Sequence, residues 1–275
     1  MIARIVWGLI ISTAISWFAY RRESLSKSGV AGAMLTGTLI FGGGGWTWGA
    51  LLITFFVLSS QLSRYREATK SQLAEKFAKG TRRDFTQALA NGGAATLLAL
   101  ANALRPHPAF FFACVGALAT VNADTWATEL GVLSQKPPRL ITTGKPVEVG
   151  ASGGVSAAGT LATLAGGASI GLAAVLFGGL DSVFGGAGVP SAALPLVLAA
   201  TGGGLAGSLC DSLLGATVQA IYYSPARHKE TEKVIDPDGT PNHHQRGWRW
   251  LNNDGVNFIS SVVGAAVAAL VYSCL

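Results

Sequence analysis

Four long stretches of this chain contain no charged residue, and they decide what it can fold into. They cover residues 28–63, 149–180, 182–210 and 255–275. A helix needs about 20 residues to cross the hydrocarbon core of a membrane, so each stretch is long enough for at least one crossing. Charged residues make up only 12% of the chain, whereas soluble domains usually contain about 25%. The sequence therefore predicts an all-α, polytopic transmembrane helix bundle that forms a single integral membrane domain over residues 1–275.

The number of crossings depends on how the stretch 28–63 is divided. As one helix it would be about 50 Å long, which is too long for a single crossing. Four consecutive glycines at 42–45 are typical of a turn, so two helices are expected there. If the stretch crosses only once, the bundle has seven helices. The eight expected helices cover 5–20, 29–41, 46–62, 85–104, 108–133, 153–180, 192–222 and 256–274.

The basic residues favour eight crossings and give the bundle an orientation. With eight helices, 18 of the 20 lysines and arginines lie on one face, and only Arg4 and Arg105 lie on the other. With seven, the division is 16 against 4. The positive-inside rule makes the basic face cytoplasmic and puts both termini outside. The cytoplasmic face then consists of inner loops 63–85, 134–150 and 223–254, and we expect the active face there.

Two carboxylates, Asp124 and Glu129, end a stretch that otherwise belongs inside a membrane. Ionisable groups at membrane depth are costly and usually face a polar cavity, a metal or a partner. Five positions correspond to about 140° of rotation on a regular helix, so the two acids do not share a face. Either the helix breaks near 122–124, or the two acids have different roles. Asn122 and Thr125 lie on the same face as Glu129 and are candidate substrate-binding residues.

The loop after Glu129 combines the cations Lys136, Arg139 and Lys145 with the glycine-rich segment 150–154. Backbone N–H groups at a helix start can bind anions, and Arg and Lys bind phosphate oxygens. Carboxylates beside such cations suit a nucleotide with Mg²⁺. A structural ion pair between an acid and a loop arginine is the simpler alternative. The segment residues that we expect to contact phosphate are Gly150, Ser152, Gly153 and Gly154.

Further polar residues occur near the inner ends of three other helices. Asp211 lies about two turns from the inner end of its helix and could reach the same cavity, or make a polar helix–helix contact. Arg82 and Arg83 are followed at helical spacing by Gln87 and Asn91, which a simple charge boundary would not require. In the segment 252–257, Asp254 is expected to cap the last helix. Asn253 and Asn257 are candidate binding residues in the same segment.

Several of these segments together resemble one family. The resemblance is carried by Asn-Ala-Asp-Thr-Trp-Ala-Thr-Glu-Leu-Gly at 122–131, Pro-Arg-Leu-Ile-Thr-Thr at 138–143 and Gly-Ala-Ser-Gly-Gly-Val-Ser at 150–156. Segments 80–93, 207–216 and 252–258 extend it, although Asp254 stands where the family pattern has Asn. The chain resembles the integral membrane family that includes the plant phytyl-phosphate kinase of tocopherol synthesis. More distantly, it is similar to CTP-using dolichol kinases and phosphatidate cytidylyltransferases.

The resemblance implies a phosphotransferase that converts an isoprenyl monophosphate to the diphosphate with a nucleoside triphosphate, ATP or CTP. The partners would be the nucleotide, a prenyl monophosphate in the bilayer and the lipid membrane itself, and no nucleic-acid partner is expected. Asp124, Glu129 and Asp211 would hold Mg²⁺, while Arg139, Lys145 and the 150–154 backbone would hold the nucleotide phosphates. Arg82, Arg83, Gln87 and Asn91 would hold the prenyl phosphate.

The sequence is also compatible with two other functions. A cytidylyltransferase would attack the α-phosphate of the nucleotide and release pyrophosphate. A transporter would show inverted repeats and polar groups near the bilayer midplane. The polar residues of this chain cluster on one side instead.

Overall fold

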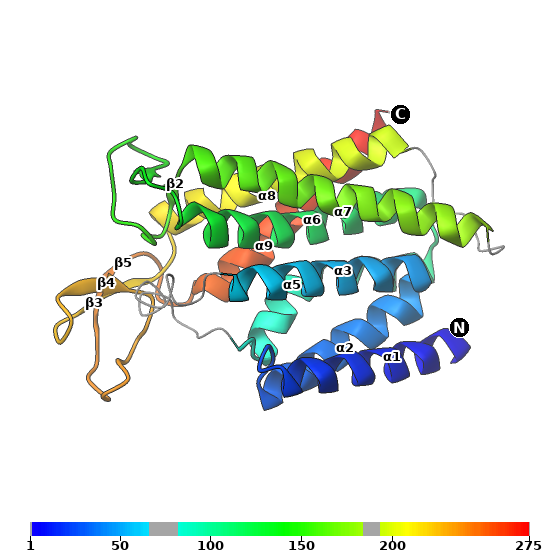
Figure 1. Ribbon diagram of the computed structural model, residues 1–275, viewed down its shortest axis with the longest axis horizontal. Coiled ribbons are helices and arrows are strands. Elements are labelled where there is room, and N and C mark those ends of the chain that lie inside the picture. Colours follow the sequence, from blue (N-terminus) through cyan, green and yellow to red (C-terminus); the bar gives the residue numbers. More distant parts are fainter. Residues whose placement is uncertain (1, 66–81, 184–192, 275) are drawn as a thin grey trace.

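The computed structural model describes residues 2–65, 82–183 and 193–274, and this part contains eight long helices that run alternately in opposite directions (Figure 1). The eight-helix count is thereby confirmed. The helices are α1 (Ile2–Arg21), α2 (Lys27–Gly44), α3 (Trp46–Arg64), α5 (Phe85–Leu104), α6 (Pro108–Gly131), α7 (Ala157–Val183), α8 (Ala193–Thr217) and α9 (Asn253–Ser273).

Within the described residues, six of these helices are long and apolar enough to cross a membrane: α1, α3, α6, α7, α8 and α9. Helices α2 and α5 are long enough but less apolar, because α2 is rich in glycine and α5 contains asparagine, glutamine and threonine. The break between α2 and α3 is a single residue, Gly45, whose φ of 88° favours glycine. The four-glycine turn was therefore predicted too broadly, since three of those glycines belong to α2.

Helix α6 is the centre of the bundle and packs against α3, α5, α7, α8 and α9. All its residues from Phe111 to Ala123 are buried. It meets α8 and α9 at Gly116, Gly203 and Gly264, where an added Cβ would overlap a neighbouring backbone. Small residues at such crossings let helices pack closely without a hydrophobic driving force. Helix α1 lies at the edge of the bundle beside α2 and exposes many large apolar side chains, as expected for contact with lipid.

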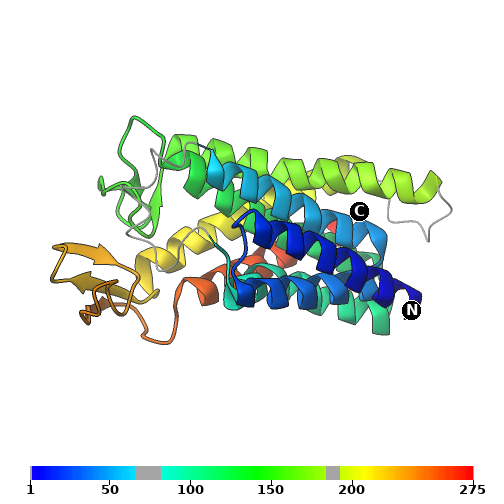
Figure 2. The same ribbon diagram turned by 60° about the horizontal axis from the view of Figure 1, so that its bottom comes forward.

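The two ends of the bundle differ. One end, called here the loop end, has the short strands, and the opposite end has both chain termini (Figures 1 and 2). Strands β1 (Arg139–Leu140) and β2 (Gly154–Val155) pair antiparallel. Strands β3 (Ile221–Ser224), β4 (Lys229–Thr231) and β5 (His243–Arg246) form a small antiparallel sheet in the order β4-β3-β5.

The strands correct two of the predicted boundaries. The helix expected over 192–222 ends at Thr217 and is followed by β3, and the helix expected from 153 begins only at Ala157, after β2. Part of the predicted inner loop 63–85, with its cations Arg66, Lys70, Lys76 and Lys79, lies outside the described residues. The described parts of all three predicted inner loops lie at the loop end (Figure 1).

Candidate functional site

A cavity of about 470 Å³ lies at the loop end, between the last turns of α6 and the first turns of α5, α7 and α9. Helix α8 and the segment 149–156 complete its wall. The volume is within the range of about 300–1,000 Å³ typical of small-molecule sites. Among the residues predicted from sequence, the cavity is lined by Arg83, Gln87, Asn91, Asp124, Thr125, Glu129, Gly150, Ser152, Gly153, Gly154, Asp211, Asn253 and Asn257.

Three carboxylates form the acidic side of this cavity. Asp124 of α6, Asp211 of α8 and Glu232, which directly follows β4, are close enough to interact electrostatically. Ser208 donates a hydrogen bond to Asp124 Oδ1 at 3.4 Å. In contrast, the buried Oδ2 atom of Asp211 has no hydrogen-bond partner among the described residues. An unpartnered buried carboxylate oxygen beside two other acids is an arrangement that a cation would stabilise.

This acidic side fits Mg²⁺ only if the ion is shared with a substrate. The described residues contain no group of three potential ligands arranged to hold a metal by themselves. Mg²⁺, however, is usually bound through one or two carboxylates, with water and substrate phosphates completing its shell. Asp124 and the free oxygen of Asp211 meet that requirement.

Glu129 has surroundings different from those of Asp124. Helix α6 continues unbroken through 122–131, so the predicted alternative of a helix break is wrong. Asp124 therefore faces Ser208 on α8, whereas Glu129 attracts Arg83 at the start of α5. The spacing therefore reflects two different sets of neighbours for the two acids, and that they have different roles stays a prediction.

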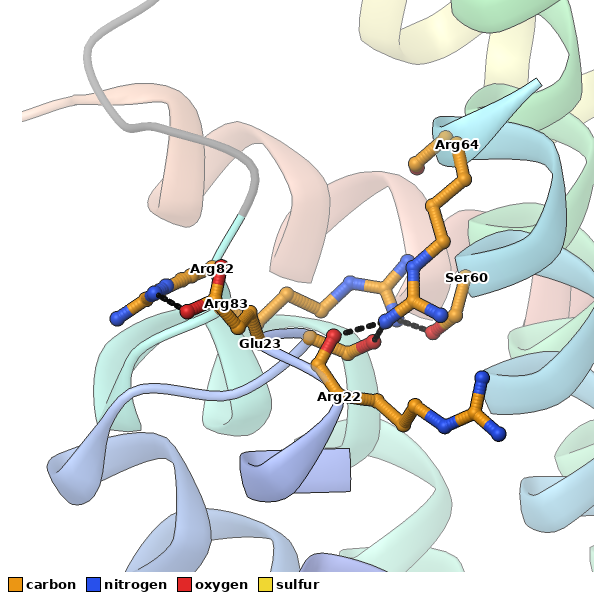
Figure 3. Close-up of a pocket in the computed structure, with 8 residues that line it drawn as sticks. Arg22, Glu23, Ser60, Arg64, Arg82 and Arg83 are labelled. Atoms are coloured by element: carbon orange, nitrogen blue, oxygen red, sulfur yellow. Dashed lines mark hydrogen bonds and ion pairs between the residues drawn. The ribbon is translucent and has the colours of Figure 1, made fainter. Parts of the chain in front are cut away.

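Arg83 is held firmly at the edge of the cavity. Its guanidinium donates to Ser60 Oγ at 3.3 Å and lies over the rings of Phe55 and Phe56, with 5.4 and 5.5 Å between the guanidinium carbon and the ring centroids. Burial lowers the pKa of Arg83 to about 10, and the nearby Glu129 opposes that shift. The side chain therefore remains positively charged at neutral pH. Arg82 is not in this cavity but pairs with Glu23 beside a second, smaller cavity (Figure 3).

The segment 149–160 brings backbone and hydroxyl groups to the cavity at the start of α7. Ser156 caps this helix by accepting a hydrogen bond from Gly159 N at 3.1 Å. Gly153 has a φ of 84°, and an added Cβ would lie only 2.6 Å from the backbone nitrogen of Ala216 on α8. Ser152 donates to Gln219 Oε1, and Gln219 in turn donates to Glu232 Oε1 at 2.8 Å. These contacts fix the segment against α8 and connect it to the acidic side.

The two cations predicted to bind nucleotide phosphates are not brought to the cavity. Arg139 and Lys145 are exposed, and neither lines the cavity wall. Arg139 donates to the carbonyl oxygen of Gly144 at 2.8 Å and so closes its own loop. Arg139 and Lys145 are close to Glu129 in the sequence, which suggested that they contact phosphate. In the structure β1 pairs with β2, and the loop residues Arg139 and Lys145 do not line the cavity.

Two other predicted binding residues have structural contacts that sequence reasoning had not assigned. Gln87 forms a capping box with Asp84: its Oε1 accepts from Asp84 N at 3.0 Å, and its backbone N–H donates to Asp84 Oδ1 at 2.9 Å. Only its amide nitrogen remains for a ligand. Asn122 is fully buried outside the cavity and donates to the Gly166 carbonyl of α7 at 2.8 Å. Asn91, one turn beyond Gln87, does line the cavity.

The start of α9 differs from the prediction in its cap. Asn252, not Asp254, caps the helix, with Oδ1 accepting from Gly255 N at 3.0 Å. Asp254 accepts a hydrogen bond from Thr86 Oγ1 at 2.8 Å and so links α9 to α5. Asn253 and Asn257 line the cavity as expected.

The cavity also contains residues that sequence reasoning missed. Glu232 was counted only as part of an inner loop, and its position depends on the β3–β4 pairing, which no local pattern predicted. Ser208 and Ser212 are four residues apart on the Asp211 helix and so share one face of it, and that spacing was the available signal for their role. Thr163 lines the cavity one turn beyond Gly159 and had no signal in the sequence.

Comparison with known proteins agrees with this architecture. The family model described as integral membrane protein DUF92 matches residues 10–265. The chain belongs to the DUF92 integral membrane family. The family resemblance expected from the motifs is thereby confirmed.

Proteins similar to this chain occur in plants and archaea. Protein PGR of Arabidopsis thaliana is 35% identical over 97% of this chain and 96% of its own length. An uncharacterised membrane protein of Methanocaldococcus jannaschii is 30% identical over 99% of this chain and 96% of its own. Protein VTE6, a chloroplastic protein of Arabidopsis thaliana, is 30% identical over 90% of this chain and 65% of its own. No solved structure matches the chain.

Proposed function

We propose that this protein is a phosphotransferase that converts an isoprenyl monophosphate to the diphosphate with a nucleoside triphosphate and Mg²⁺. Membership of the DUF92 family and the similarity to VTE6 support a role in isoprenoid metabolism of the kind that leads to tocopherol. The substrate and the reaction are our inference from the cavity and from the motif resemblance described above.

One observation carries the proposal: the same cavity combines carboxylates with the first turns of three helices. Asp124 and Asp211 lie on its acidic side, and the N-terminal turns of α5, α7 and α9 lie on other walls. A helix N-terminus attracts anions through its dipole and the N–H groups that its cap leaves free, and α7, capped by Ser156, is the one of these three helices with no acid in its cap or first turn. A cation site next to several anion sites is what two phosphate-bearing substrates joined by Mg²⁺ require.

The cavity walls suggest a division of roles. We assign Mg²⁺ to Asp124 and Asp211, with Glu232 nearby, and the nucleotide phosphates to the backbone of 150–154 and the start of α7. The acceptor phosphate would contact Arg83 and Asn91, with Asn253 and Asn257 of α9 on the adjacent wall. Glu129 would orient Arg83 through their electrostatic attraction.

The proposed chemistry needs no strong general base, because the acceptor is already an anion. An oxygen of the prenyl phosphate attacks the γ-phosphorus, the bond from that phosphorus to the β–γ bridging oxygen breaks, and the nucleoside diphosphate leaves with the electron pair. Bound Mg²⁺ would neutralise charge on the β- and γ-phosphates. Arg83 would neutralise the acceptor and hold it in line, and positioning of this kind supplies most of the rate in phosphoryl transfer.

Purified protein in detergent, incubated with Mg²⁺, a panel of prenyl monophosphates and either ATP or CTP, tests the proposal. A nucleoside diphosphate and a prenyl diphosphate are the expected products. Release of pyrophosphate with a lipid–cytidylyl product would instead identify a cytidylyltransferase. Absence of any nucleotide-dependent product, together with uptake of a solute into proteoliposomes, would identify a transporter.

A further inference from the structure

A second cavity, of about 140 Å³, lies at the loop end where α1 and α3 finish and α5 begins. Figure 3 shows several of its side chains, which come from segments far apart in the sequence. Arg83 and Ser63 line both this cavity and the larger one, so the two are neighbours. The residues of this cavity that matter here are Arg22, Glu23, Ser60, Arg64, Arg82 and Arg83. We call them the arginine cavity.

The arginine cavity has more positive than negative side chains. Glu23 is the one acid among the lining residues that the structure describes, and it pairs with Arg82. Among the described residues, Arg64 donates to neutral groups, the backbone oxygen of Arg22 and Ser24 Oγ, the latter at 2.7 Å. Arg83 donates to neutral Ser60, and its acidic neighbour Glu129 belongs to the larger cavity. Figure 3 shows the guanidinium groups of Arg64 and Arg83 between those of Arg22 and Arg82, and an anion beside Arg64 and Arg83 would relieve the repulsion between their charges.

The size of the cavity limits what that anion can be. Sites for drug-sized molecules start at about 300 Å³, so a space of 140 Å³ suits a single small group and not a nucleotide. Arginine binds phosphate oxygens through its planar fork of N–H donors. A phosphate group is therefore the ligand whose size, charge and geometry agree with the lining.

The flanking aromatic residues place this cavity at the level of lipid headgroups. Trp17 and Phe18 at the end of α1 are 59% and 60% exposed, on a helix that exposes apolar side chains along its length. Arg21 lies over the Trp17 ring at 5.6 Å, and Arg22 over the Phe18 ring at 5.1 Å. Aromatic and basic residues together are typical of the membrane–water interface. A phosphate at the head of a membrane lipid would thus reach the cavity at its natural depth.

We infer that the arginine cavity binds the phosphate monoester at the head of a membrane lipid. A monoester carries up to two negative charges and leaves three oxygens free, whereas a diester has one charge and an additional bulky headgroup. Phosphatidate and an isoprenyl monophosphate share this chemistry. If the ligand is the isoprenyl monophosphate, the inference rests on the proposed function. The arginine cavity would then bind the substrate first, and Arg83, which lines both cavities, would contact its phosphate in each.

The test is lipid binding to the full-length protein in nanodiscs, measured without nucleotide. The probes are phosphatidate, a prenyl monophosphate, phosphatidylglycerol as the diester and inorganic phosphate. Both lipid monoesters should bind and compete, at least about tenfold more tightly than the diester. Arg64→Gln and Arg82→Gln should each weaken monoester binding about tenfold or more, since each removes a charge-assisted hydrogen bond. Arg21→Gln is the matched control, because Arg21 has the same charge and depth but does not line the cavity.

A further variant distinguishes loss of binding from misfolding of the arginine variants. Glu23→Gln removes the one acid of the lining and should tighten monoester binding about two- to fivefold, the usual size of an exposed ion pair. A folding defect cannot produce tighter binding.

Equal affinities for monoester and diester, or an Arg21→Gln loss as large as that of Arg64→Gln, would overturn the inference. Competition by prenyl monophosphate alone would identify the substrate as the ligand, and equal competition by phosphatidate would identify a general lipid site. Because no nucleotide is present, these results are independent of whether the kinase reaction occurs.

Discussion

The surroundings of Asp211 are the strongest indication of a bound cation at single-residue level. Its Oδ2 atom is buried and makes no hydrogen bond among the described residues, although the Ser260 hydroxyl of α9 lies close to the carboxyl, and it is in the electrostatic field of Asp124 and Glu232. A purely structural polar contact between helices would satisfy such an oxygen. The sequence could identify Asp211 as a candidate, but its relation to Asp124 and Glu232 depends on how α6, α8 and the β3–β4 segment pack.

We therefore expect Asp124→Asn and Asp211→Asn each to lower kcat by at least about 10²-fold, because each removes a principal electrostatic contact. If both hold one ion, the double variant should be little worse than the poorer single variant, since residues that act as a unit are not additive. Steady-state kinetics over a range of Mg²⁺ concentrations provides the measurement. Asp181→Asn, near the opposite end of α7, is the matched control. Near-native turnover in either single variant would leave these acids with a structural role only.

Arg83 and Lys145 provide a second comparison at the level of single residues. Both are cations of predicted inner loops, yet Arg83 lines the cavity and Lys145 is exposed away from it. Arg83→Ala should raise the KM for the prenyl phosphate about 10- to 100-fold, as expected for a lost charge-assisted hydrogen bond. Lys145→Ala should leave both KM values nearly unchanged. A two-substrate kinetic matrix distinguishes these outcomes, and a selective rise in the nucleotide KM for Lys145→Ala would restore the role predicted from the sequence.

At the scale of elements, the helices were predictable and the connections at the loop end were not. Apolar runs, Gly45 and the Asp84–Gln87 capping box are local features, so the sequence determines where α2, α3 and α5 begin or end within a few residues. Strands β1 to β5 have two to four residues each, too few for a periodic pattern. Their pairing depends on contacts between segments that only the packed bundle brings together. This is why Arg139 lies away from the cavity and Glu232 was missed, whereas Asn253 and Asn257, at the start of a predictable helix, line it.

The docking of segment 149–156 on α8 gives a prediction for an element. Gly153 and Gly144 both have positive φ, but an added Cβ at Gly153 would overlap Ala216, while at Gly144 it meets nothing within 4 Å. Gly144→Ala should therefore cost only the backbone strain, about 1–2 kcal/mol. Gly153→Ala should in addition displace the segment and reduce kcat/KM for the nucleotide by about 10²-fold, since a shift of about 1 Å can have that effect. Thermal unfolding in detergent and nucleotide kinetics on both variants test the difference. Equal kinetic losses would mean that this segment does not position the nucleotide.

At the scale of the whole molecule, the arrangement is polarised. The carboxylates, the three helix N-termini and the arginine cavity all lie at the loop end, away from both termini. Apart from Arg4 and Arg105, the basic residues that the structure describes lie at the same end, as the eight-helix count requires. A soluble nucleotide and a lipid headgroup can reach this end from opposite directions, the first from water and the second along the membrane surface. Such polarity suits a phosphotransferase better than a transporter, whose binding site is expected near the midplane.

Which side of the membrane the loop end faces is the remaining prediction. The positive-inside rule assigns it to the cytoplasm. Labelling of single cysteines in intact cells tests this after replacement of the native Cys210 and Cys274, which are partly or fully exposed, whereas Cys114 is buried. Lys136→Cys and Glu230→Cys, both at the loop end, should react only with a membrane-permeant reagent, and Arg105→Cys, between α5 and α6 at the opposite end, should also react with an impermeant one. Reaction of Lys136→Cys and Glu230→Cys from opposite sides would contradict the arrangement of the helices. Reaction of both from outside would keep that arrangement but reverse its orientation, and the nucleotide would then have to be supplied from the other compartment.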